Sequence, residues 1–142
     1  MHPVLPDNYS LSYSRLASLT GRLRKSPEIL REYDRAIKDQ QSRGIVETVS
    51  SDDATHVHYL PHRDVVRSDK QTAKLHIVIY ASAKRGGPSL NDCMHAGPPL
   101  TLLLMDIMMR FRCHQIALVG DIEKAFLMVG VNEADRNVFR FL

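Results

Sequence analysis

The sequence predicts an α+β fold. Apolar residues recur at helical spacing up to Gly44, a residue type that favours helix ends, and short β-branched runs follow it. A longer helix and two further apolar strands are expected beyond residue 98, so the predicted order is helices, strands, helix, strand and strand. The chain has 142 residues, 44% hydrophobic and 25% charged, which is typical of one globular domain and excludes a disordered, collagen-like or coiled-coil protein.

Two helices are predicted before Gly44. Leu16, Leu19 and Leu23 recur at spacings of three and four residues, so they lie on one helix face. Ser26-Pro27-Glu28 then combines an N-cap residue, a proline suited to the first helical position and an early acid. A second helix therefore starts there.

The second helix has one apolar and one polar face. Ile29, Tyr33 and Ile37 form its apolar stripe, and Asp34 and Lys38 can pair across one turn on the other side. Seven basic residues lie between positions 22 and 43. Such residues more often form a solvated face than a binding surface, and the first interpretation is preferred.

Strands are expected after residue 44, where β-branched residues replace the helical spacing. The expected strands are residues 45–49, 57–60, 65–66 and 75–80. Polar stretches at 50–53 and 68–71 are expected to be turns, and Pro61 places its strand at an edge or ends it.

The remaining elements follow residue 88. Ser89 and Asp92 have the spacing of a capping box at the start of a helix. A longer helix is predicted over residues 99–112, and strands over residues 115–119 and 138–142. The chain is expected to stop inside the last strand.

Charge and composition limit the possible partners only loosely. The chain has 19 basic and 16 acidic residues, a net charge of +3, which permits nucleic-acid binding without requiring it. The most apolar stretch, 100–109, contains Asp106 and is shorter than the ~20 residues of a membrane span. Two cysteines and no visible signal peptide favour a reducing interior. We therefore expect a cytoplasmic location and no membrane partner.

The strongest chemical signal is Asp121, which follows the apolar run 115–119. A carboxylate at the exit of a buried strand is held rigidly while open to solvent, which suits a Mg²⁺ ligand. The alternative is that Asp121 only caps the following turn, and the residues favour neither. Glu123 and Lys124 are expected to be surface residues.

Histidines and cysteines cluster in places, but not at zinc-site spacing. The candidates are His56, His58, His62, Cys93 with His95, and Cys113 with His114. A structural zinc site is not expected, and both cysteines are predicted to be small buried apolar residues.

Several short blocks occur in order along nearly the whole chain. They are Tyr59-Leu60-Pro61-His62, Thr72-Ala73-Lys74-Leu75, Ala81-Ser82-Ala83-Lys84, Gly87-Pro88-Ser89-Leu90-Asn91-Asp92-Cys93, Gly97-Pro98, Arg110-Phe111-Arg112 and Asp121-Ile122-Glu123-Lys124-Ala125-Phe126. Together they resemble the reverse transcriptase of BEL/Pao-type LTR retrotransposons. Asn8-Tyr9 and Gly44 fit the segment that precedes the fingers in that family. An ordered series of blocks is far more specific than any single motif.

The resemblance implies the fold of a right-hand polymerase. Residues 1–44 would be an N-terminal helical segment, residues 45–95 the fingers, and residues 96–142 the first part of an incomplete palm. The implied partners are an RNA or DNA primer–template, dNTPs and the remainder of a polyprotein. The implied location is the cytoplasm or a virus-like particle.

The resemblance also implies roles for five residues. Asp121 would be the first catalytic aspartate, binding two Mg²⁺ ions together with the backbone carbonyl of Ile122. Phe126 would be the aromatic steric gate against the sugar, although its residue type alone favours core packing. Lys74 and His76 would lie in the fingers strand, whose basic residues bind the triphosphate of the incoming nucleotide in that family.

The chain departs from the family pattern at two positions of that strand. His76 stands where an arginine is expected, and histidine is mostly neutral near pH 7 and lacks the bidentate fork of a guanidinium. Tyr80 stands where an aspartate is expected. Both changes count against nucleotide binding.

The aromatic-x-Asp-Asp motif that would complete the metal site is absent from the 142 residues. One carboxylate cannot hold two metal ions, so we expect no polymerisation by this chain alone. Whether the chain is an enzyme therefore stays open. The first hypothesis is a reverse-transcriptase fragment, the second a non-catalytic remnant of a decayed transposon, and the third a retained nucleic-acid-binding module.

Overall fold

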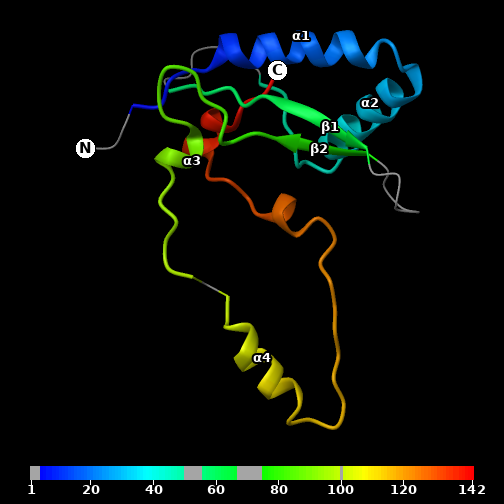
Figure 1. Cartoon of the computed structure of the whole chain (residues 1–142), viewed down its shortest axis with the longest axis vertical. Coiled ribbons are helices and arrows are strands. Elements are labelled where there is room, and N and C mark those ends of the chain that lie inside the picture. The colour runs from blue at the N-terminus through cyan, green and yellow to red at the C-terminus, as the bar shows by residue number, and fades with distance from the viewer. Residues whose placement is uncertain (1–3, 50–55, 67–74, 100) are drawn as a thin grey trace. The chain divides into compact units, whose positions relative to one another are not determined.

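Residues 4–49, 56–66, 75–99 and 101–142 are described by the computed structural model of the chain. Within these ranges the protein has four α-helices, two 3-10 helices and one two-stranded antiparallel sheet (Figure 1). The predicted mixed α+β class is therefore confirmed. The chain divides into two compact units, a larger one formed by Met1–Met94 with Gly130–Leu142, and a smaller one formed by His95–Val129.

The two N-terminal helices form where the apolar spacing predicts them. Helix α1 spans Tyr9–Leu23 and helix α2 spans Pro27–Ser42, with the proline at its first position. After α2 ends, Gly44 adopts a left-handed backbone with φ of 69°, which a glycine accommodates without steric cost. The predicted pair of Asp34 and Lys38 is also present, at 2.7 Å on the exposed face.

The small core lies between these helices and the sheet. Leu19, Leu23 and Tyr33 are its buried members. Leu75 and Ile77 from the sheet pack against them from the other side, so the predicted stripes of both helices face inward.

The sheet consists of β1 (His62–Val66) and β2 (Leu75–Ile79), with His62 opposite Ile79 and Val66 opposite Leu75. Helix α1 packs on β1 and α2 packs on β2 (Figure 1). The strand prediction at 65–66 is confirmed, and that at 75–80 is confirmed up to Ile79.

The strand predicted at 45–49 is wrong. The N–H groups of Ile45 and Val46 donate to the carbonyl oxygen of Gln40, at 2.9 and 3.3 Å. These amides complete the C-terminal end of α2 and cannot also form a sheet ladder.

The predicted capping box is confirmed at α3 (Leu90–Cys93). The Ser89 N–H donates to Asp92 Oδ2 at 2.9 Å, and the Asp92 N–H donates to Ser89 Oγ at 3.3 Å. Lys84 Nζ lies 3.0 Å from the same carboxylate. The backbone hydrogen bond from Ser89, and then the bond from Lys84, lower the pKa of Asp92 to about 2.

The C-terminal segment returns to the larger unit as the 3-10 helix η2 (Glu133–Phe139). Asn132 starts this helix by accepting the Ala134 N–H on its side chain at 3.2 Å. The strand predicted at 138–142 is therefore wrong, because helical backbone continues to residue 139. The strand predicted at 57–60 is also wrong. Only Tyr59 in this stretch pairs with another segment, in one isolated parallel bridge with Arg140.

The smaller unit contains α4 (Leu104–Phe111), which is shorter than the predicted helix at 99–112, and the 3-10 helix η1 (Ala125–Met128). The strand predicted at 115–119 is wrong, because this stretch has irregular backbone and exposed side chains. A strand needs a neighbour for its N–H and C=O groups, and the described part of this unit provides none. Among the described helices, none has the length and apolarity to cross a membrane.

Candidate functional site

Asp121 lies in the irregular segment between α4 and η1, and its side chain is exposed. Its Oδ1 accepts the N–H of Ile122 at 2.9 Å. No hydrogen bond of Oδ2 is found within the described ranges, so one carboxylate oxygen remains open to solvent. This bond reaches only the next residue, whereas a side chain that caps a turn accepts the N–H two or three residues on, and no such bond of Asp121 is found among the described residues. The open oxygen has the chemistry that a cation prefers.

The donor set at Asp121 fits Mg²⁺ in kind but not in number. The carboxylate of Asp121 and the carbonyl oxygen of Ile122 are hard oxygen ligands, which Mg²⁺ prefers. In the described part of the chain, no group of three or more His, Cys, Asp or Glu side chains is placed to hold a metal ion. Asp121 and Ile122 alone therefore do not make a complete metal site among the described residues.

Phe126 lies in η1 and is 94% exposed. Core packing, which its residue type alone favours, is not observed. The residue before this helix, Lys124, has a left-handed backbone with φ of 54°, so the chain turns sharply between Asp121 and Phe126. The ring is free to contact a ligand.

Of the other two predicted nucleotide-binding residues, the structure describes only His76. His76 is exposed on β2 of the larger unit, opposite Val65. Lys74 lies outside the described residues. The structure thus groups Asp121, Ile122 and Phe126 in one segment of the smaller unit.

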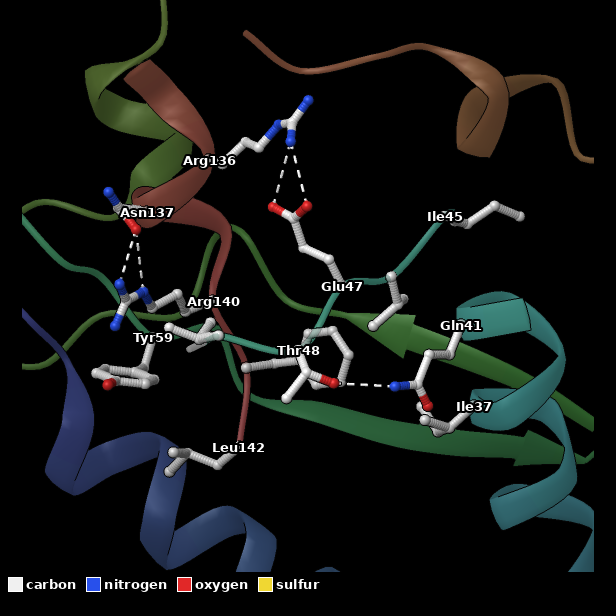
Figure 2. A pocket seen from close by; sticks show the side chains of 13 residues that line it. Ile37, Gln41, Ile45, Glu47, Thr48, Tyr59, Arg136, Asn137, Arg140 and Leu142 are labelled. Atoms are coloured by element: carbon white, nitrogen blue, oxygen red, sulfur yellow. Dashed lines mark hydrogen bonds and ion pairs between the residues drawn. The ribbon is translucent and has the colours of Figure 1, made fainter. Parts of the chain in front are cut away.

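A cleft of about 440 Å³ lies in the larger unit between the end of α2, the following segment and the C-terminal residues (Figure 2). Ile37, Ile45 and Leu142 contribute apolar surface to it. Arg136 Nη1 donates to both carboxylate oxygens of Glu47, at 3.5 and 3.2 Å.

Four further polar residues of this cleft are also paired. Arg140 donates twice to Asn137 Oδ1, at 3.2 and 2.8 Å, and Gln41 Nε2 donates to Thr48 Oγ1 at 2.9 Å (Figure 2). These contacts engage the donors that line the cleft. Glu47 compensates the charge of Arg136, whereas the partner of the buried Arg140 is a neutral amide. Sequence reasoning did not find this cleft.

A second cleft of about 420 Å³ lies between α1, β1 and the end of β2. It is lined by Arg15, Ser18, Leu19, Arg22, His62, Arg63 and Tyr80. None of these seven residues is acidic. Sequence reasoning noted Tyr80 only as a departure, and no local pattern connects it to Arg15, 65 positions earlier.

A buried polar chain lies beside this cleft. The Tyr33 hydroxyl is hydrogen-bonded to His62 Nδ1, and His62 Nε2 lies 2.8 Å from the main-chain oxygen of Leu142. Because the oxygen of Leu142 only accepts, a neutral imidazole carries its proton on Nε2 and accepts the Tyr33 hydroxyl at Nδ1. Burial, and secondly the charge of Asp64, raise the pKa of Tyr33 well above its usual range.

The remaining histidine and cysteine candidates are not gathered into one site. His58 is buried and its Nδ1 is hydrogen-bonded to the Pro6 carbonyl oxygen, whereas His56 is exposed. Cys113 is exposed, so the prediction of burial is wrong for it, and Cys93 is half-buried. Cys113 follows the short helix α4, which has no buried residue to pack it against.

Comparison with known proteins found no matching family model, no significantly similar curated protein and no significantly similar solved structure.

Proposed function

We propose that this chain comprises the fingers and the first part of the palm of an RNA-directed DNA polymerase resembling those of BEL/Pao-type retrotransposons. In the parent enzyme it would take part in metal-dependent nucleotidyl transfer on a primer–template. The observation that carries the proposal is the ordered series of sequence blocks ending in Asp121–Phe126. The solvent-open carboxylate of Asp121 and the exposed ring of Phe126 support it.

Each residue of this segment has a defined task under the proposal. Asp121 supplies a carboxylate oxygen, and Ile122 its main-chain carbonyl, to Mg²⁺. When bound, the metal lowers the pKa of the primer 3′-hydroxyl and stabilises the charge on the leaving pyrophosphate. Phe126 contacts the sugar of the incoming nucleotide and excludes a 2′-hydroxyl by its bulk.

The test begins with the transcript beyond Leu142. An in-frame aromatic-x-Asp-Asp motif is expected there, and the chain is then expressed together with the segment that contains it. We expect Mg²⁺-dependent incorporation of dTTP on poly(rA) primed with oligo(dT). Asp121→Asn is expected to abolish it, while Glu123→Gln, a matched neutralisation two residues away, retains it.

The same assay gives a second readout through the sugar. Phe126→Ala is expected to admit ribonucleotides that the unsubstituted enzyme rejects. Incorporation that survives Asp121→Asn would overturn the proposed role of the carboxylate. No incorporation by the extended chain would overturn the polymerase proposal.

A second candidate function, a non-catalytic nucleic-acid-binding remnant, is favoured by the two departures on the fingers strand. His76 is exposed on β2 and offers no guanidinium fork there. A stop codon or frameshift before any aromatic-x-Asp-Asp motif would leave Asp121 without partner ligands. That result would establish the remnant in place of the polymerase.

A further inference from the structure

The cleft between α1, β1 and the end of β2 gathers arginines around one aromatic ring. The guanidinium carbon of Arg15, from α1, lies 5.8 Å from the centre of the Tyr80 ring, and that of Arg63, from β1, lies 5.4 Å from it. Both distances are within the range of a cation–π contact. Arg15 and Arg63 are exposed, while Tyr80 is half-buried.

No carboxylate of the described residues compensates the charge of these two arginines. A third arginine of the cleft, Arg22, forms a bidentate pair with the buried carboxylate of Asp64. Within the described ranges, Arg15 and Arg63 form no ion pair with any carboxylate. The cleft therefore presents two positive charges to solvent.

Tyr80 is what leaves the two charges free. A tyrosine ring orients guanidinium groups through its π face but carries no charge at neutral pH. An aspartate, the residue type predicted at this position by the resemblance, would bring a carboxylate toward the same two groups and neutralise part of their charge. The backbone N–H of Tyr80 donates to the Pro61 carbonyl oxygen at 2.9 Å, which fixes the backbone of Tyr80 at the end of β2.

The neighbouring polar groups of the cleft are already engaged. The Ser18 hydroxyl donates to the Ser14 carbonyl oxygen at 3.1 Å, and both ring nitrogens of His62 are hydrogen-bonded. The chemistry left for a ligand is that of two guanidinium forks, which bind phosphate oxygens in bidentate fashion.

We propose that Arg15, Arg63 and Tyr80 form a binding site for a phosphate group. The ligand is either a phosphodiester of a single-stranded nucleic acid or an isolated phosphate ion, both recognised by the same two forks. The site does not depend on the proposed polymerase activity, since it uses no residue of the Asp121 segment.

The experiment measures binding of fluorescein-labelled oligothymidylate to the 142-residue chain by fluorescence anisotropy over a series of salt concentrations. Arg15→Gln and Arg63→Gln are each expected to weaken binding about 10-fold. Each is also expected to reduce the slope of log affinity against log salt by about 0.7, the value for one phosphate contact on a single strand. Arg35→Gln, which removes an equal charge from the exposed side of α2, is the matched control and keeps the original slope.

Substitutions of the ring test its role separately. Tyr80→Phe keeps the aromatic face and is expected to bind like the unsubstituted chain. Tyr80→Asp is expected to weaken binding more than either arginine variant, because one carboxylate faces both guanidinium groups. Circular dichroism monitors folding, and the two glutamine variants at exposed positions decide the result if Tyr80→Asp does not fold.

Inorganic phosphate as a competitor identifies the source of the ligand. The site is assigned to an isolated ion if two results are found together. Phosphate displaces the oligonucleotide, and Arg63→Gln abolishes the binding of phosphate. Tight oligonucleotide binding that phosphate does not displace assigns it to a nucleic-acid backbone. The proposal is overturned if neither probe binds, or if Arg35→Gln weakens binding as much as Arg15→Gln does.

Discussion

Replacement of Tyr33 by phenylalanine isolates the buried hydrogen bond between α2 and β1. The Tyr33 side chain is 8% exposed and its hydroxyl donates to His62 Nδ1. Phenylalanine keeps the ring and its packing, so no cavity forms. The loss is confined to the hydroxyl group, and it leaves a buried imidazole nitrogen without a donor.

The expected cost depends on pH in a defined way. Near neutral pH, the unsatisfied nitrogen is expected to lower the free energy of unfolding by about 1–2 kcal/mol. The pKa of Tyr33 is raised by folding above its unfolded value of 10.0, so its contribution is fully present below about pH 10 and is lost as the pH rises toward the folded value. One pH unit above 10.0, ionisation of Tyr33 in the unfolded state has lowered the free energy of unfolding of the unsubstituted chain by about 1.4 kcal/mol. The phenylalanine variant has no hydroxyl at this position to ionise, so it does not undergo this loss. The two chains should then be almost equally stable.

Urea unfolding followed by far-ultraviolet circular dichroism measures this difference at about pH 7 and about pH 11. Tyr13→Phe is the matched control, since Tyr13 is 58% exposed on α1 and its substitution should change neither value. A gap between Tyr33→Phe and the unsubstituted chain that stays constant from neutral to alkaline pH would refute the reasoning. Equal stability of Tyr33→Phe and the unsubstituted chain at neutral pH would also refute it.

Three further predictions concern other contacts of the larger unit. Arg22→Ala leaves the buried Asp64 carboxylate unpaired and should cost about 1–3 kcal/mol in urea unfolding, below the value for a fully buried pair because the Arg22 side chain is 58% exposed. Leu19→Ala should cost about 2–5 kcal/mol in the same assay, since Leu19 is 4% exposed in the core. The lowered pKa of Asp92 means that its contribution to the capping box is present above about pH 4 and is lost as the pH falls toward 2. Carboxyl NMR titration should find a midpoint near 2 that rises in Lys84→Ala, and a midpoint near 4 in the unsubstituted chain would contradict the bonding described.

The parts of the fold that depend on nearby residues were predictable from sequence. The start of α2 at Pro27 and the capping box of Ser89 with Asp92 each involve residues within one helical turn. Local hydrogen-bonding preferences decide such features, so a single sequence contains them.

Strand predictions failed where the partner of the strand decides the outcome. Residues 75–80 and 45–49 have similar β-branched character, yet only the former lies opposite another strand. The amides of Ile45 and Val46 are used by α2 instead. Strand formation depends on which backbone lies alongside, which residue types do not specify.

The same difference between local and long-range information separates the two candidate sites. Asp121 was found because it follows a recognisable run of residues, whereas the Arg15 and Arg63 site was not found because its members come from three elements. In the helices, the prediction that basic residues form a solvated face holds for Lys38, which pairs with Asp34. It does not describe Arg22, whose guanidinium binds the buried Asp64 across 42 positions of sequence.

Under the proposed function, the failed strand at 115–119 and the missing metal ligands beside Asp121 would have one physical cause. A carboxylate can fix a metal ion only when its backbone is held in place, and the backbone before Asp121 has no neighbouring strand within the described residues. The apolar run at 115–119 has the composition of a buried strand, and its side chains are exposed. Under the proposed function, the segment that supplies the aromatic-x-Asp-Asp motif would also supply that neighbouring strand. Ordering of residues 115–119 and metal binding at Asp121 should therefore appear together when the longer chain is made, and Asp121→Asn should remove the metal while leaving the new strand paired.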